Sequence, residues 1–190
     1  MTKVRVHTVA IVASTAALTL TGCGGASSET STPSSTATAT STSATTSTAG
    51  STSTAALPTD CATLGTEPTR EEAIGDLTLQ GNGDGFVRPA PAEATLALGC
   101  DWIVGDSTGL LLLISTAEPA AVTTAVAGLP AVGYTCQESE DYAAQFCDRP
   151  GAGPDTEEMV VARDDVWIYL STSNRNGRAF LSDIVDGLFD

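Results

Sequence analysis

A tract made almost entirely of Ser, Thr and Ala separates the two ends of this chain. Of the 28 residues from Ser27 to Thr54, 21 are Ser or Thr, and none carries a large apolar side chain. Such a segment buries nothing that would offset the entropy lost on ordering. We therefore expect a flexible tether of roughly 30 Å root-mean-square length, which is also a candidate for O-linked glycosylation. A folded domain is thereby confined to residues 58–190.

The chain begins with the features of a bacterial lipoprotein signal. Lys3 and Arg5 precede an uncharged, largely apolar stretch over residues 9–20, which is shorter than the about 20 residues that a membrane-spanning helix needs. The sequence Leu-Thr-Gly-Cys at residues 20–23 resembles a lipobox. This resemblance implies cleavage before Cys23 and acyl chains on its sulfur, which would anchor the protein in a membrane. An ordinary signal peptide with a chance cysteine and an uncleaved signal anchor are the alternatives.

Three parts follow from these two features. Residues 1–22 are the predicted signal peptide, residues 23–57 the lipidated cysteine and its tether, and residues 58–190 one extracytoplasmic domain. At some 130 residues, the domain is large enough for its own hydrophobic core. The expected location is the outer face of the cytoplasmic membrane.

The charge balance excludes whole classes of partner. Removal of Lys3 and Arg5 with the signal leaves six arginines, no lysine and all 23 acidic residues, so the net charge becomes −17. Nucleic-acid binding requires clustered cations, and so does adhesion to anionic lipid. We expect neither, apart from the membrane contact made through the lipid on Cys23.

The lack of histidine restricts the chemistry further. His7, the only histidine, lies in the predicted signal, so the domain has neither a Ser/His/Asp or Cys/His mechanism nor a histidine metal site. The stretch from Gly81 to Gly85 is similar to part of a calcium loop, but Gln80 and Pro91 stand where that loop needs ligands. We therefore predict no enzyme activity, no cofactor and no metal. Only carboxylate-pair chemistry survives as a catalytic alternative.

Four cysteines remain after Cys23, an even number that indicates two disulfides in an exported chain. They are Cys61, Cys100, Cys136 and Cys147. Three pairings are open, of which we favour Cys61 with Cys100 and Cys136 with Cys147, because the second pair suits a short clipped hairpin. A zinc site made from all four thiolates is disfavoured, since no C-x-x-C spacing is present.

Hydrophobic periodicity predicts helices and strands in a mixed order. Helices are expected at 70–74, after a capping box that begins at Thr69, at 118–129, and at 176–189. The last has a buried stripe made of Phe180, Leu181, Ile184, Val185 and Leu188. Strands are expected at 96–104, 109–115, 133–138, 143–148, 159–162 and 166–171, the second of them apolar on both faces.

This order predicts an α+β fold, a curved antiparallel sheet with helices packed on one face. The immunoglobulin sandwich is the competing class, suggested by Cys100 and Trp102. The spacing is wrong for it, because in that fold the tryptophan lies well downstream of the first cysteine.

Several short motifs resemble those of small actinobacterial lipoproteins of the DUF3558 family. They are the lipobox, the Ser/Thr tether, Cys61-Ala-Thr-Leu-Gly followed by Thr69-Arg-Glu-Glu-Ala-Ile-Gly75, and Gly99-Cys100-Asp-Trp102. The chain also has a looser similarity to disulfide-bonded extracellular sensor domains of actinobacterial kinases. Both resemblances imply a location in the cell envelope, and neither transfers a catalytic site.

Three aromatic residues are the candidates for a ligand surface. Trp102 would either form the floor of a pocket or pack over a disulfide. Trp167 and Tyr169 alternate with Val166 and Ile168, so they would form an outward aromatic surface or lie beneath a helix.

These features favour a non-catalytic binding or sensor module that engages a cell-wall component, a small ligand or another envelope protein. A cell-wall hydrolase with a carboxylate pair and a structural or inhibitor-like envelope protein are the alternatives.

Overall fold

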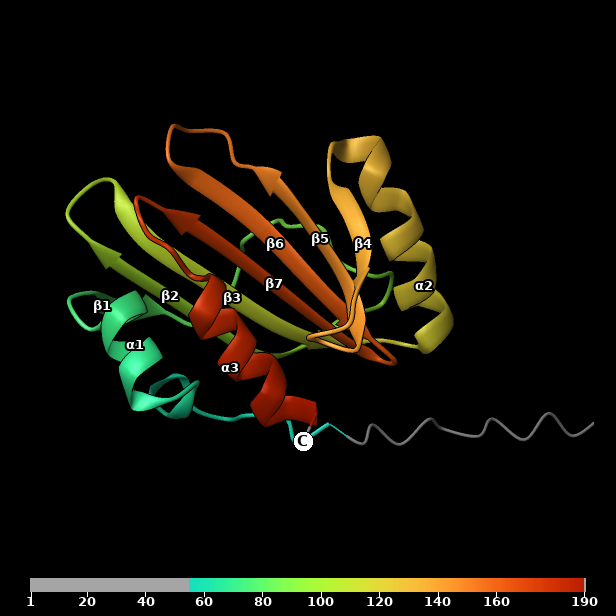
Figure 1. Cartoon of the computed structure of the whole chain (residues 1–190), viewed down its shortest axis with the longest axis horizontal. Helices are drawn as coiled ribbons and strands as arrows, with labels where there is room; N and C mark the ends of the chain where they lie inside the picture. The colour runs from blue at the N-terminus through green and yellow to red at the C-terminus, as the bar shows by residue number, and fades with distance from the viewer. Residues whose placement is uncertain (1–54, 190) are drawn as a thin grey trace, which may run out of the picture. The chain divides into compact units, whose positions relative to one another are not determined.

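The computed structural model describes residues 55–189, which form an open antiparallel sheet with three α-helices (Figure 1). The predicted signal peptide, Cys23 and most of the predicted tether lie outside the described residues. The strands are β1 (Thr78–Gly81), β2 (Thr95–Val104), β3 (Thr108–Thr116), β4 (Thr135–Ser139), β5 (Ala144–Pro150), β6 (Thr156–Arg163) and β7 (Val166–Ser173). The helices are α1 (Glu67–Ile74), α2 (Pro119–Gly128) and α3 (Arg178–Phe189), with short 3₁₀ helices η1 (Cys61–Thr63) and η2 (Leu129–Val132).

The strands follow the spatial order β1-β2-β3-β7-β6-β5-β4, and all neighbours are antiparallel. Strands β4 to β7 form a meander, and β7 then inserts beside β3, with Leu112 opposite Leu170. β3 buries six consecutive residues from Leu110 to Ser115, as a strand covered on both faces must. The predicted α+β class and the antiparallel sheet are confirmed.

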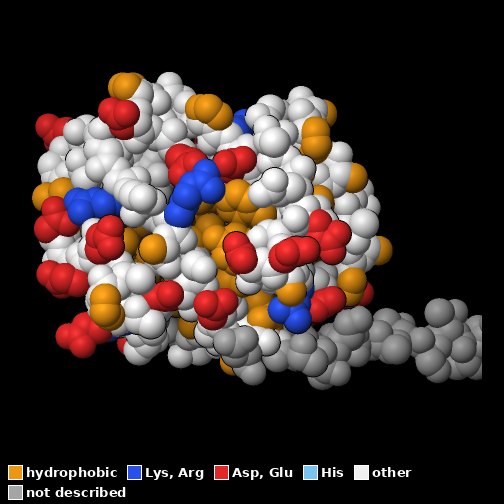
Figure 2. All heavy atoms as spheres, viewed as in Figure 1, with side chains coloured by type: hydrophobic (Ala, Val, Ile, Leu, Met, Phe, Trp, Pro, Cys, Tyr) orange, Lys and Arg blue, Asp and Glu red, His pale blue; other side chains and the backbone are white. Residues whose placement is uncertain are grey.

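One side of the sheet, here called the α3 face, is closed by α1 and α3 (Figure 1). The α3 face comprises the strand residues whose side chains pack with Phe180 of α3, among them Leu110, Leu112, Ile168 and Leu170. The predicted helical stripe is confirmed, because Phe180, Leu181, Ile184, Val185 and Leu188 are all buried. Figure 2 shows this side of the molecule, where acidic side chains outnumber basic ones.

The opposite side, here called the α2 face, comprises Leu111, Leu113, Val160, Trp167 and Tyr169. Val122 of α2 is buried against this cluster, with Ala125 and Val126 packed beside it. The prediction of helices on one face was therefore wrong for α2. The physical reason is that the consecutive leucines of β3 point alternately to the two faces, so both faces must be covered.

The start of α1 also differs from the prediction. The helix begins at Glu67 after Thr66, with Pro68 in its first turn, where the fixed φ of proline favours an early start. The hydroxyl of Thr69, predicted to cap the helix, instead donates to Asp183 Oδ2 of α3 at 2.6 Å. Asp183 Oδ2 also accepts from the backbone N–H and the hydroxyl of Thr66, so this carboxylate ties the start of α1 to α3.

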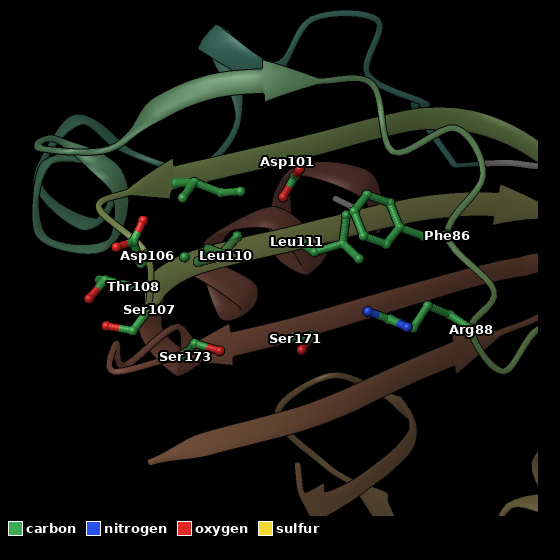
Figure 3. A pocket seen from close by; sticks show the side chains of 12 residues that line it. Phe86, Arg88, Asp101, Asp106, Ser107, Thr108, Leu110, Leu111, Ser171 and Ser173 are labelled. Atoms are coloured by element: carbon green, nitrogen blue, oxygen red, sulfur yellow. The ribbon is translucent and has the colours of Figure 1, made fainter. Parts of the chain in front are cut away.

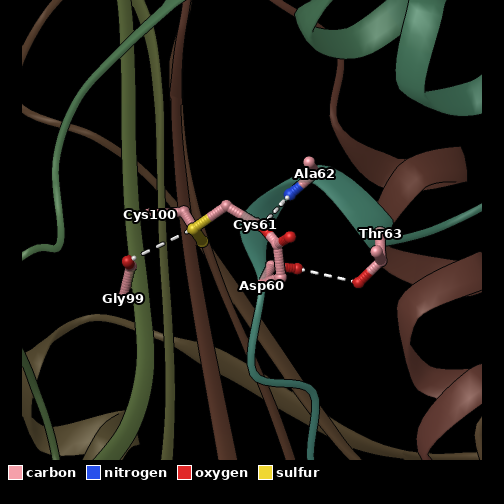
Figure 4. Close-up of a disulfide and its surroundings, with 6 residues drawn as sticks. All are labelled: Asp60, Cys61, Ala62, Thr63, Gly99 and Cys100. Carbon is pink, nitrogen blue, oxygen red and sulfur yellow. Dashed lines mark hydrogen bonds between the residues drawn. A yellow bond between two sulfur atoms is a disulfide. The ribbon is translucent and has the colours of Figure 1, made fainter.

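Both favoured disulfides are present. Cys61 and Cys100 join η1 to β2 (Figure 4), and Cys136 and Cys147 stand opposite each other in β4 and β5. Asp60 begins η1 by accepting the N–H of Ala62 with its side chain. The first disulfide belongs to the core of the α3 face, and Cys147 belongs to that of the α2 face.

Candidate functional site

The segment from Asn82 to Ala94, here called the strap, crosses the α2 face from β1 to β2 (Figures 1 and 3). Gly99 lets the strap approach, because a Cβ there would lie 1.9 Å from the carbonyl oxygen of Asn82. Gly83 rests on Leu113 with φ +74°. Farther along, Trp167 Nε1 donates to the carbonyl oxygen of Pro89 at 3.0 Å. The strap is thus attached to β2, β3 and β7, although the sequence predicts only a turn within it.

A cavity of about 240 Å³ lies between the strap and the sheet, open to solvent at the end of the β2–β3 hairpin (Figure 3). Its lining combines both charges, four hydroxyl groups and a small apolar floor. The lining residues are Phe86, Arg88, Asp101, Ile103, Asp106, Ser107, Thr108, Gly109, Leu110, Leu111, Ser171 and Ser173. None of the three predicted ligand-surface aromatics is among them.

Arg88 is the cation of this cavity. Its guanidinium lies 5.3 Å from the centroid of the Phe86 ring and 5.9 Å from that of Tyr169, at distances typical of cation–π contacts. Its one side-chain hydrogen bond goes to the carbonyl oxygen of the neighbouring Val87. In the part of the chain that the structure describes, no carboxylate lies within ion-pairing distance of Arg88. The guanidinium therefore keeps most of its donors available.

Two carboxylates line the same cavity, Asp101 on β2 and Asp106 in the β2–β3 turn. Burial raises the pKa of Asp101 above its ordinary value of 3.8, and the charge of Arg88 acts in the opposite direction. In Figure 3, Arg88 extends from the strap at one end, whereas Asp106 lies at the other end with Ser107, Thr108 and Ser173. The cavity is therefore polarised along its length.

A second cavity of about 180 Å³ continues on the other side of Phe86 and Arg88. Here the lining is more apolar and includes Leu113, Trp167 and Tyr169. Phe86 and Arg88 belong to both cavities and separate them. The strap thus roofs a hollow that continues across the sheet.

A compact polar cluster borders this hollow on β6. Glu158 accepts hydrogen bonds from the hydroxyl of Tyr134 at 2.7 Å and from Nε and Nη2 of Arg149 at 3.2 and 2.9 Å. Burial alone would raise the pKa of Glu158, but the hydrogen bonds from Tyr134 and Arg149 outweigh it and lower the pKa below 4.5. Arg149 Nη1 also donates to the carbonyl oxygen of Val132 in η2 at 2.7 Å, so the cluster ties η2 and β5 to β6.

The three predicted aromatic candidates are almost fully buried. Trp102 is 5% exposed and stands edge-on to Phe180, with ring centroids 6.2 Å apart, so it packs in the core of the α3 face. Trp167 and Tyr169 are each 1% exposed. They face away from Val166 and Ile168, as the alternation predicts, but the strap and the other residues of the α2 face cover them. No flat aromatic surface forms from this pair.

Tyr169 nevertheless contributes to the hollow. Burial raises its pKa to about 12, and the negative charge of Glu158 adds to this rise. Its hydroxyl is buried and makes no hydrogen bond of normal geometry with the described residues, although Glu158 and Ser171 are its polar neighbours. A buried hydroxyl of this kind favours an additional polar partner.

Sequence reasoning missed Phe86, Arg88, Asp101 and Asp106. One signal was available, since Arg88 is one of only six arginines beyond the predicted signal and stands in a segment rich in Gly and Pro. Asp101 lay within the Gly99–Trp102 motif, but its partners come from the strap and β7. Only the fold brings these residues together.

Within residues 55–189, no group of three or more His, Cys, Asp or Glu side chains is placed to hold a metal ion. Asn82 and Asp84, from the calcium-like stretch, hydrogen-bond to each other. None of the described helices combines the length and apolar character needed to cross a membrane.

Comparison of the chain with protein-family models, with curated proteins and with solved structures finds no match. The class that the fold itself defines is a small disulfide-bonded α+β domain with an open seven-stranded antiparallel sheet.

Proposed function

We propose that this protein is a lipid-anchored envelope protein whose domain binds a ligand outside the cytoplasmic membrane. The observation that carries the binding role is the cavity beneath the strap, where Arg88 faces Asp101 and Asp106 without an ion pair. Small-molecule sites are concave and combine apolar walls with a few charged or polar groups. Two disulfides and a closed α3 face make the support of this cavity rigid.

The anchor is supported by the sequence at residues 20–23 alone. Cys23→Ala should release the protein from the membrane fraction and abolish incorporation of a labelled fatty acid, because the acylated thiol is lost. Ser27→Ala, four residues later in the tether, is the control and should remain attached. Full membrane retention of Cys23→Ala would refute the anchor without bearing on the cavity.

The binding role is tested by photo-crosslinking in intact cells. A photoreactive residue in place of Ser173, at the cavity, should capture a specific ligand or partner. The same group in place of Thr124, exposed on α2, is the control. Recovery of identical products from both positions, or of none from Ser173, would argue against a binding cavity.

A carboxylate-pair hydrolase is the second candidate, because Asp101 and Asp106 line one cavity and burial raises the pKa of Asp101, as a general acid requires. Asp101 and Glu158 do not form such a pair. Three strand spacings separate them, about 14 Å at about 4.8 Å each, and glycosidase carboxylates lie closer. Release of reducing sugar from purified cell wall, lost in both Asp101→Asn and Asp106→Asn, would favour the enzyme. We expect no such release.

A further inference from the structure

Arg88 differs from most of the other described arginines because its guanidinium has no carboxylate partner within residues 55–189. Arg149, Arg163, Arg175 and Arg178 each lie within 4 Å of a carboxylate oxygen. Arg70 instead donates to the carbonyl oxygens of Leu64 and Gly65. Among the described residues, Arg88 has no carboxylate partner, and its side chain donates only to the carbonyl oxygen of Val87. In so acidic a chain, an arginine without a carboxylate is a prepared site for one, since its planar fork matches a carboxylate with two parallel bonds.

The carboxylate of Asp101 has the complementary need. It lies between Arg88 and Asp106 in Figure 3. Asp101 is partly desolvated, which disfavours its charged form, and Arg88 is not close enough to form an ion pair with it. A ligand ammonium group at Asp101 would replace the lost hydration with charge-assisted hydrogen bonds, and Asp106 adds a second negative charge farther along the cavity.

The two ends together select against ligands with a single charge. A simple anion at Arg88 would be repelled by Asp101 and Asp106, and a simple cation would be repelled by Arg88. Along the cavity, Ser171 and Ser173 supply hydroxyl groups, while Leu111 and the Phe86 ring supply apolar contact (Figure 3). The lining is thus complementary to a dipolar molecule with a small apolar part.

The volume limits the size of that molecule. A cavity of about 240 Å³ holds roughly eight waters at about 30 Å³ each, which is about eight non-hydrogen atoms. An amino acid with a small side chain fits this space, whereas a peptide would extend through the open end.

We propose that the cavity beneath the strap binds a small zwitterion, a free amino acid or a short peptide, with its carboxylate at Arg88 and its ammonium group at Asp101. The inference rests on the proposed binding function and names the ligand class of that same cavity. Phe86 and Leu111 contact the ligand side chain, and Ser171 and Ser173 complete its hydrogen bonds.

The test is calorimetric titration of the full chain, purified in detergent, with matched probes. Alanine and alanyl-alanine carry both charges, whereas N-acetyl-alanine lacks the ammonium group and alaninamide lacks the carboxylate. N-acetylglucosamine is the neutral probe. We expect binding of at least one zwitterion at concentrations up to about 10 mM, and at least tenfold weaker binding of its blocked forms.

Substitutions test which residue binds each charged group of the ligand. Arg88→Gln should weaken zwitterion binding by at least about tenfold, and Asp101→Asn should do the same, because each removes one charge-assisted contact. Arg163→Gln and Asp164→Asn, both at the β6–β7 turn, are the matched controls and should bind as the wild type does. Thermal unfolding of each variant verifies that it is folded. The blocked probes test the same contacts on the unmodified protein.

Three results would overturn the proposal: no heat with any zwitterion, equal binding of zwitterions and their blocked forms, or binding of the sugar alone. These outcomes differ from failure of the proposed function. Specific capture from Ser173 in cells, with no zwitterion binding, would leave a binding cavity for another ligand class. Absence of both would remove the binding function itself.

Discussion

The two faces of this sheet are built from the same strands but are covered to different extents. The α3 face is closed by two helices, and Leu112, Ile168 and Leu170 on it have no solvent exposure. The α2 face is covered by one helix and the strap, and it retains two cavities with charged walls. Complete closure gives stability, whereas incomplete closure leaves room for a ligand on a rigid support.

The disulfides should give the largest effects, and the bridge of the α3 face the larger of the two. Replacing both Cys61 and Cys100 by Ala should lower the free energy of unfolding by about 4 kcal/mol, and replacing both Cys136 and Cys147 by about 3 kcal/mol. The difference follows from sequence separations of 39 and 11 residues. Urea unfolding followed by tryptophan fluorescence measures both. A greater loss from the second pair would contradict the chain-entropy argument.

Adjacent leucines on β3 compare the two faces directly. Leu112→Ala should cost about 3–4 kcal/mol, because it leaves a cavity in the closed α3 face. Leu111→Ala should cost about 2 kcal/mol, at the low end of the range for this change, since Leu111 already borders an open cavity. The same unfolding measurement serves, with Val87→Ala, 90% exposed, as the control. Equal losses at both leucines would mean that the two faces are equally well packed.

Glu158 should produce the smallest effect and one that depends on pH. Its pKa is lowered in the folded protein, so its contribution is complete above its ordinary value of about 4.5 and is lost as the pH falls through the folded pKa. Glu158→Gln should therefore lower stability by about 1–2 kcal/mol at pH 7. The difference in stability between the variant and the wild type should become smaller below pH 4.5.

Thermal unfolding from pH 7 down to about pH 3 measures this difference. Glu140→Gln, in the exposed β4–β5 turn, is the control and should follow the wild type. A difference that stays constant across the acidic range would show that the carboxylate charge of Glu158 does not stabilise the α2 face.

Local patterns predicted the helical stripe of α3 and the disulfide between β4 and β5 well. The stripe of α3 is a 3.6-residue periodicity within one helix, and the disulfide from Cys136 to Cys147 lies within one hairpin. Such features depend on residues close in the chain. β1 escaped prediction because it has only four residues, all of them exposed, and so carries no burial pattern.

The α2 face was less predictable, because its contacts join distant segments. Trp167 holds Pro89, 78 positions away, and β7 reaches Leu111 only by inserting between β3 and β6. The apolar alternation of Trp167 and Tyr169 correctly predicted a shared face. The sequence contains no signal for the strap that covers them.

The sequence alone predicted the α+β class and the helical stripe, and it shows that residues 23–190 contain no histidine. It is also the source of the hypothesis that the protein is exported and anchored through Cys23. Each of these depends on composition or on residues near one another in the chain. Only the tertiary structure decided which face α2 covers, where the strap lies, and that Arg88 and Asp101 face each other across a cavity. The reason is physical: charge complementarity across a site depends on strand order and loop path, and neither leaves a periodic trace in the sequence.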